Sequence, residues 1–184
     1  MLREGVAARV YQARELLQQK HPGYSFLIFD GLRPVNVQQH MVDLTLAAFA
    51  AREGKEIATL SDEDRARLMN EVLVFWSVPS ADPARPPLHS TGGAVDLTII
   101  DESGVPLDMG TGFDHFGPES ATRYFADRDQ VLHTNRMLLC EVMFAAGFTN
   151  YANEWWHFDY GTPRWAFQTG AGAAIYGRVD LLDN

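Results

Sequence analysis

The segment Leu88–Asp96 is the sequence feature that most constrains how this chain folds. Its glycine pair, Gly92-Gly93, permits a tight turn or a close approach of two backbones. The next residues, 94–100, are apolar or β-branched except for Asp96, and such a run is typical of a strand. Because strands are depleted in Asp, an Asp inside this one is unusual. We therefore expect the turn to fold His89 back beside Asp96.

A second segment, Glu154-Trp155-Trp156-His157, carries another imidazole and another carboxylate. A strand over residues 155–160 would point alternate side chains to opposite faces, while Glu154 lies just before it. Two imidazoles and one carboxylate suit zinc and leave a fourth coordination position open for water. We expect one Zn²⁺ per chain, with Glu154 as the base that takes a proton from the zinc-bound water. The expected metal ligands are His89, Asp96 and His157.

Each of these residues is a weaker signal alone than in combination. An isolated His near a strand is usually an ordinary polar group, and the helical zinc motif His-Glu-x-x-His is absent. Glu154 alone could be a surface carboxylate. In the loop that follows the metal strand, Asp114 could orient a ligand His or cap the loop. His115 is a further, weaker candidate for a functional role.

Taken in order, the motifs resemble the D-alanyl-D-alanine dipeptidase family, the zinc peptidases of the vancomycin-resistance type. The similarity runs from about Leu2 to Gly177. It implies an α+β fold and a small dipeptide substrate. The matching motifs are Phe29-Asp30-Gly31-Leu32-Arg33-Pro34, His89–Asp96, Asp108–Asp114, Glu154–Phe158 and Ala174–Gly177.

Arg33 belongs to the first motif and follows a predicted strand. Its guanidinium would stabilise the oxyanion of a tetrahedral intermediate together with zinc. A structural ion pair with Asp30 is the alternative. One position departs from the family, which commonly has Ser two residues before His89; here that residue is Pro87. The missing hydroxyl leaves the exact dipeptide preference open.

Three functions are compatible with these motifs. The first is a zinc dipeptidase for D-alanyl-D-alanine or a related D,D-dipeptide. The second is a D,D- or L,D-carboxypeptidase or an endopeptidase of the same zinc group, acting on peptidoglycan peptides. The third is a non-catalytic zinc-binding module, which the related hedgehog signalling domain resembles. A binding module needs neither Glu154 nor Arg33, and no cell-wall anchoring module is seen, so the dipeptidase is favoured.

Composition restricts the partners. The net charge of −9 argues against binding to nucleic acid or to an anionic membrane. No apolar run reaches the length of a membrane span, and the start lacks the apolar core of a signal peptide, so a cytoplasmic location is expected. The single cysteine, Cys140, excludes an internal disulfide and is expected to be a buried, inert thiol. The oligomeric state stays open.

Hydrophobic periodicity and turn residues predict one α+β domain over residues 1–184, in which a small antiparallel sheet carries the zinc site and helices pack against it. One face of the second helix should be buried through Val37, Met41, Leu44 and Ala48. Ser61 should cap the third helix. Residues 165–182 are expected to be irregular because of their glycines. The predicted helices are 2–20, 34–52, 62–76 and 129–146, and the predicted strands are 25–30, 94–100, 105–108, 148–151 and 155–160.

Overall fold

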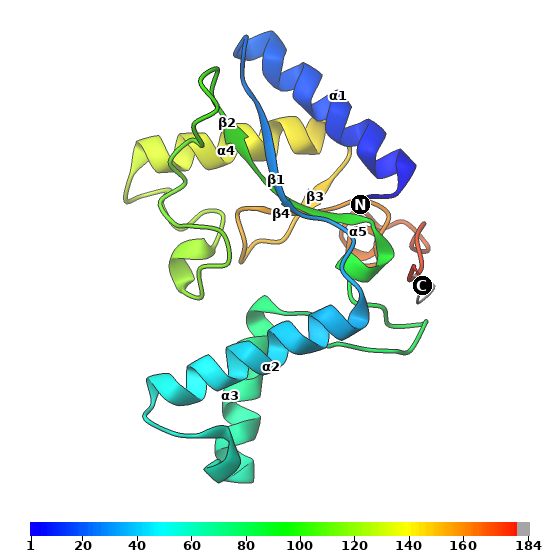
Figure 1. Ribbon diagram of the computed structural model, residues 1–184. Coiled ribbons are helices and arrows are strands. Elements are labelled where there is room, and N and C mark those ends of the chain that lie inside the picture. Colours follow the sequence, from blue (N-terminus) through cyan, green and yellow to red (C-terminus); the bar gives the residue numbers. More distant parts are fainter. Residues whose placement is uncertain (180–184) are drawn as a thin grey trace.

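The computed structural model describes residues 1–179 and has the α+β architecture that the sequence predicts (Figure 1). Among these residues no helix is long and apolar enough to cross a membrane. The helices are α1 (Glu4–Lys20), α2 (Val35–Arg52), α3 (Asp62–Phe75), α4 (Gln130–Ala145) and α5 (Pro163–Thr169). The strands are β1 (Ser25–Asp30), β2 (Ala94–Ile100), β3 (Thr149–Asn150) and β4 (His157–Asp159), and three short 3₁₀ helices are η1 (Ile57–Thr59), η2 (His89–Thr91) and η3 (Pro118–Ser120).

The strands form one antiparallel sheet in the order β1-β2-β4-β3. β2 therefore lies between β1 and β4. Its register places Asp96 opposite His157 of β4 and opposite Asp30 of β1. Strand pairing thus brings residues that are 61 positions apart in the chain to one place in the sheet.

One face of the sheet packs against α1 and α4 and forms the main hydrophobic core. The apolar residues of β2 that enter this core are Val95, Leu97 and Ile99. Since side chains alternate along a strand, Asp96 and Thr98 point to the opposite face. The predicted strand at 94–100 is confirmed, and its alternation separates the core side chains from those of the site.

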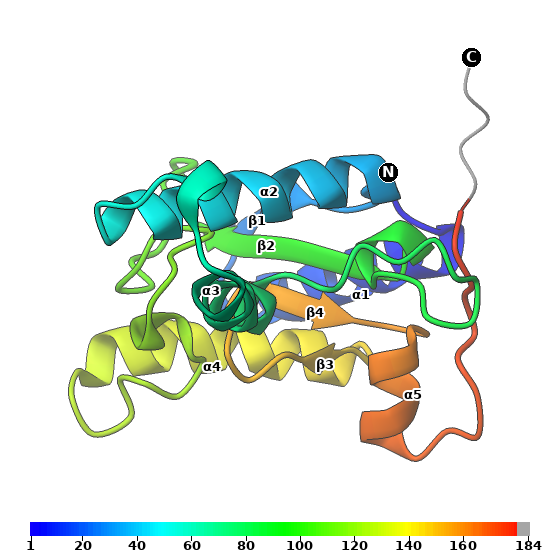
Figure 2. The same ribbon diagram turned by 90° about the horizontal axis from the view of Figure 1, so that it is seen from below.

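A second hydrophobic cluster joins α2 to α3, and we call these helices the α2–α3 pair. In Figure 2 this pair lies on the viewer's side of β2 and β4, with α1 behind them. The buried residues of the cluster are Val42, Leu46, Phe49, Ala50, Leu68, Val72 and Trp76. The pair therefore has a small core of its own beside the sheet.

The predicted buried face of α2 was wrong. Val37 and Leu44 are 42% and 56% exposed, while Val42 and Leu46 are buried. Apolar residues occur nearly all round the second half of this helix, so periodicity alone does not select a face. Packing against α3 determines which face of α2 is buried. The predicted cap of α3 is confirmed, because the Asp64 amide donates to Ser61 Oγ at 3.1 Å.

Several other segments differ from expectation. The stretch predicted to be irregular begins with α5, which Thr162 caps through a hydrogen bond from the Trp165 amide and which ends at Gly170 with φ of 71°. Residues 180–182 of that stretch lie outside the described part. The predicted strand 105–108 is reduced to one bridge, between Ile100 and Pro106. The strands near the C-terminal end are also shorter than predicted, because two-residue β3 pairs only with part of β4.

Candidate metal centre and active site

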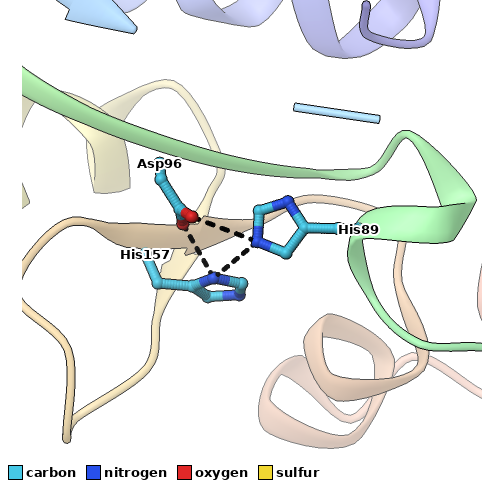
Figure 3. A group of neighbouring side chains, drawn as sticks. All are labelled: His89, Asp96 and His157. Carbon is cyan, nitrogen blue, oxygen red and sulfur yellow. Dashed lines mark hydrogen bonds and ion pairs between the residues drawn. The ribbon is translucent and has the colours of Figure 1, made fainter. Parts of the chain in front are cut away.

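The three expected metal ligands converge on one point, and each comes from a different element (Figure 3). His89 lies in η2, a 3₁₀ turn that Gly92 closes with φ of 68°. Asp96 and His157 lie on the paired strands β2 and β4. The left-handed backbone at Gly92 reverses the chain before β2, as the glycine pair predicted. All three ligand side chains are buried.

The spacing of the donor atoms fits a zinc ion. His89 Nε2 lies 3.2 Å from His157 Nδ1, which lies 3.0 Å from Asp96 Oδ1; Asp96 Oδ2 lies 3.3 Å from His89 Nε2. Donors arranged tetrahedrally around Zn²⁺ at bond lengths of about 2.0–2.2 Å stand about 3.3–3.6 Å apart. The two imidazole nitrogens and the Asp96 carboxylate, which turns one oxygen toward each imidazole, are therefore spaced closely enough to bind one zinc ion. All three side chains line a pocket, which leaves a fourth coordination position accessible.

The outer nitrogen of each imidazole is already engaged. His89 Nδ1 lies 2.8 Å from the carbonyl oxygen of Gly31, and His157 Nε2 lies 3.1 Å from Asp159 Oδ2. Both partners accept hydrogen bonds, so these outer nitrogens carry the protons of the neutral rings. The inner nitrogens then turn unprotonated lone pairs toward each other and toward Asp96. Such an arrangement is repulsive unless a positive charge lies between them.

The electrostatics of the cluster favour a cation in its centre. Burial alone would raise the pKa of Asp96, but His89 and His157 hold that pKa well below its usual range. Burial alone would lower the pKa of His157, but Asp159 and Asp96 raise it to about 10. The site thus attracts a proton when no metal is present, and a divalent cation would compete for the same position.

Glu154 lies at the mouth of this cluster. Its Oε2 is 3.9 Å from His157 Nδ1, and its side chain is buried. The backbone is fixed because the Glu154 amide donates to the Tyr151 carbonyl and Asn150 Nδ2 donates to the Glu154 carbonyl. Burial raises the pKa of Glu154 to about 8, although His157 acts in the opposite direction. The carboxyl group can therefore exchange a proton near neutral pH, as a general base must.

Arg33 enters the site from the segment between β1 and α2. Its Nε and Nη2 atoms contact Asp30 Oδ2 at 2.7 and 2.5 Å, and Nη1 donates to Gln38 Oε1 at 2.8 Å. Nη2 also lies 3.8 Å from Asp96 Oδ2. The ion pair with Asp30 that the sequence left as an alternative is therefore formed, and the guanidinium still borders the metal ligands.

Comparisons with known proteins identify the family. The family model for peptidase M15, described as D-ala-D-ala dipeptidase, matches residues 1–168. The chain belongs to this family. It is similar to the D-alanyl-D-alanine dipeptidase of Synechocystis sp., with 38% identity over 98% of this chain and 79% of that protein. A protein of the same name from Escherichia coli is 44% identical over 39% of this chain and 36% of its own length.

A solved structure shows the same fold. It is a mutant of the vancomycin-resistance D,D-pentapeptidase VanY from the VanB-type cassette, in complex with Zn(II). The TM-score is 0.53 at 17% identity, over 94% of this chain and 80% of that one. Family membership confirms the predicted resemblance and the predicted enzyme class, a metallopeptidase.

The dipeptidase-family site contains groups that the sequence prediction missed. Asp159, which orients His157, lies two residues further along β4 and so on the same face of the sheet. The signal that could have identified Asp159 was an acidic residue two positions after His157 on the predicted strand. Gln38, Tyr151 and Arg164 also line the pocket next to the metal ligands, and nothing in their local sequence marked them.

The two weaker candidates in the loop, Asp114 and His115, differ in their position relative to the pocket. Asp114 lines the pocket, has φ of 56°, and has its pKa raised to about 6, mainly by burial and then by Asp96. His115 is half exposed and lies 3.4 Å from Glu119 instead. It is not among the residues that line this pocket.

Proposed function

We propose that this chain is a zinc-dependent dipeptidase that hydrolyses D-alanyl-D-alanine or a related small D,D-dipeptide. One observation carries the proposal: two buried imidazoles and one buried carboxylate bring their donor atoms together, with Glu154 beside them. Membership of the dipeptidase family and the zinc complex of the similar VanY structure support the choice of substrate and metal. His89, Asp96 and His157 would hold one zinc ion per chain.

Each residue has a defined task in this mechanism. Zinc bound by the three ligands would supply Lewis-acid chemistry and lower the pKa of a water molecule to about 7. Glu154 takes the proton from the attacking water and returns it to the nitrogen of the leaving amine. Arg33 donates hydrogen bonds to the carbonyl oxygen as that oxygen becomes negative. Asp159 keeps the ring of His157 in the tautomer that leaves Nδ1 free for the metal.

The shape of the pocket favours a small substrate over a longer peptidoglycan peptide. The end of α3 and the residues after it, 73–78, line the pocket opposite the metal ligands. This wall is tied to the other side, because Tyr151 Oη donates to the Val74 carbonyl at 2.9 Å and Gln38 Nε2 donates to the Ser77 carbonyl at 2.9 Å. A dipeptide needs only an enclosed pocket, whereas a stem peptide needs an open groove.

The direct test combines metal analysis with a substrate panel. The purified chain is expected to bind one zinc and to hydrolyse D,D-dipeptides faster than L,D- and L,L-dipeptides. A pentapeptide that ends in D-Ala-D-Ala serves as the competing substrate, and faster release of its last residue would establish the carboxypeptidase instead. Stoichiometric zinc without any hydrolysis would favour the non-catalytic module. A cytoplasmic location and a single domain over residues 1–184 stay predictions.

A further inference from the structure

Two arginine side chains line the pocket, and they differ in how many of their donors are used. Arg33 uses one N–H of each of its three nitrogens for Asp30 or Gln38, so fewer of its donors remain for a ligand. Arg164, at the start of α5, makes no hydrogen bond to any residue within 1–179. Its one ion pair there, to Asp159 Oδ2, spans 3.7 Å, which is longer than a hydrogen bond. The donors of Arg164 are thus available to a ligand.

The position of Arg164 is nevertheless well defined. Its guanidinium stacks on the ring of Tyr151, with the carbon Cζ 3.9 Å from the ring centroid. That ring is itself fixed by the hydrogen bonds that join Tyr151 Oη to the Val74 carbonyl and to Asn153 Nδ2. Stacking uses the face of a guanidinium and leaves its N–H edge free for in-plane hydrogen bonds. The side chain remains 27% exposed, so this edge is accessible.

The remaining charges of the pocket make Arg164 important for any anionic ligand. Three carboxyl side chains, those of Asp96, Asp114 and Glu154, line the same pocket. Those of Asp114 and Glu154 lie outside the proposed zinc ligands, and when ionised they oppose the approach of a negatively charged group. Arg33 is already neutralised in part by Asp30, so Arg164 is the lining cation with the most free donors in the part of the chain that the structure describes.

We propose that Arg164 binds the free C-terminal carboxylate of the substrate through a two-pronged hydrogen bond. This inference rests on the proposed dipeptidase function. Arginine matches a carboxylate with two parallel N–H···O bonds, a geometry that lysine cannot copy. In a dipeptide, this carboxylate lies one residue beyond the scissile carbonyl, and one residue spans at most about 3.3–3.6 Å. Arg164 lines the same pocket as His89, Asp96 and His157, and Asp159 links it to His157.

The consequence for specificity is direct. An arginine that binds the terminal carboxylate here selects substrates whose last residue has a free carboxylate. It also places the peptide bond before that residue at the metal centre. Peptides that continue beyond this residue, and peptides that end in an amide, lose the ion pair. Arg164 is therefore a determinant of cleavage position, independent of the side chains that the pocket accepts.

The test compares D-alanyl-D-alanine with D-alanyl-D-alaninamide in the zinc-loaded wild type, in Arg164→Ala and in Arg164→Lys. We expect wild type to prefer the free acid in kcat/KM by roughly ten- to a hundredfold, the usual range for a hydrogen bond to a charged group. Arg164→Ala should lose most of this preference through a higher KM for the acid, with little change for the amide. Arg164→Lys should fall between the two. Arg128→Ala is the matched control, because Arg128 also stacks on a tyrosine, Tyr124, but lies outside this pocket.

Measurements of ligand binding and of zinc content distinguish a failure of the Arg164 proposal from a failure of the proposed function. Calorimetry with the zinc-loaded, slow variant Glu154→Gln should show the same preference for the acid, and the added Arg164→Ala change should abolish it. A preference that survives in Arg164→Ala, or that is absent from wild type, overturns the inference. Loss of zinc from Arg164→Ala also overturns it, since Arg164 would then act through Asp159. If wild type hydrolyses no dipeptide, the proposed function fails, and the binding comparison still decides the role of Arg164.

Discussion

His157 is held between two buried carboxylates: its Nδ1 lies 3.0 Å from Asp96 and its Nε2 lies 3.1 Å from Asp159. Asp159 is fixed in turn by a hydrogen bond from Thr162 Oγ1 at 2.9 Å. The orientation of one proposed metal ligand therefore depends on a residue outside the proposed ligand set.

Asp159→Asn should weaken zinc binding without removing a ligand. The amide keeps the size of the side chain but loses the charge that fixes the tautomer of His157. Changes of this kind typically reduce metal affinity about 10- to 100-fold. Competition with a chromophoric chelator measures the affinity. Asp43→Asn removes the same charge from an exposed position on α2 and should leave zinc binding unchanged. Equal affinities in Asp159→Asn and wild type would show that Asp159 does not support the ligand.

Glu154→Gln should retain zinc and lose most of its turnover. The glutamine has nearly the same volume but cannot take a proton from water. The expected fall in kcat is at least about a hundredfold, the usual scale for general-base catalysis. Initial rates with D-alanyl-D-alanine and zinc content by mass spectrometry measure the two effects. Glu141→Gln, an exposed carboxylate of α4, is the control. Near-normal turnover by the zinc-loaded Glu154→Gln protein would remove Glu154 from the mechanism.

Arg33→Lys should lower kcat more than it raises KM. Lysine keeps a positive charge but cannot bond Asp30 and Gln38 while also reaching the oxyanion. If Arg33 acts as one oxyanion donor, removing it altogether in Arg33→Ala should cost about 2.7–4 kcal/mol of transition-state stabilisation. Steady-state kinetics at equal zinc loading measures both substitutions, and circular dichroism reports folding. An unfolded Arg33→Ala, together with an unimpaired kcat in Arg33→Lys, would make the residue purely structural.

Cys140 should be unreactive in the folded protein. The thiol is buried in the main core, and burial raises its pKa from an ordinary value of 9.0 to about 12. The unfolded chain therefore releases this proton first, so the contribution of the buried thiol to stability is fully present below pH 9 and is lost as the pH rises toward 12. Alkylation with iodoacetamide at pH 8, followed by mass spectrometry, should modify the denatured chain alone. Equal labelling of the native chain would contradict the burial.

Local sequence patterns predicted which side chains come together at the site better than they predicted which face of α2 is buried, and the reason is physical. The glycine pair before β2 and the unusual Asp96 within it are local signals, and strand pairing with β4 completes the site as alternation predicts. The buried face of α2 depends instead on which helix packs against it, and a helix with apolar residues on most sides does not reveal that choice. The predicted ligands do come together, whereas the catalytic tasks of Glu154 and Arg33 stay predictions.

The residues added by the structure were missed for different reasons. Asp159 lies two residues after His157 on the same face of β4, so strand alternation could have identified it. Gln38 and Arg164 border the pocket only because of how the chain folds, and no motif in their local sequence marks them. The helix α5 was missed because the glycines that follow it favoured an irregular structure. Its capping residue, Thr162, precedes the segment that was predicted to be irregular. The lengths of the short strands were overestimated because their pairing partners, and not the strand propensity of their residues, determine where β3 and β4 end.

The two separate hydrophobic clusters have a consequence for how this enzyme can change. Of the proposed metal ligands, Asp96 and His157 stand on strands that share the core of α1 and α4, and His89 lies in the turn η2 just before β2. The opposite wall of the pocket extends from the α2–α3 pair, which has its own small core. Substitutions inside that smaller core can reshape the wall, and so the range of dipeptides admitted, while the zinc donors keep their positions. Selection for a new substrate therefore has a region to act on that leaves the chemical step intact.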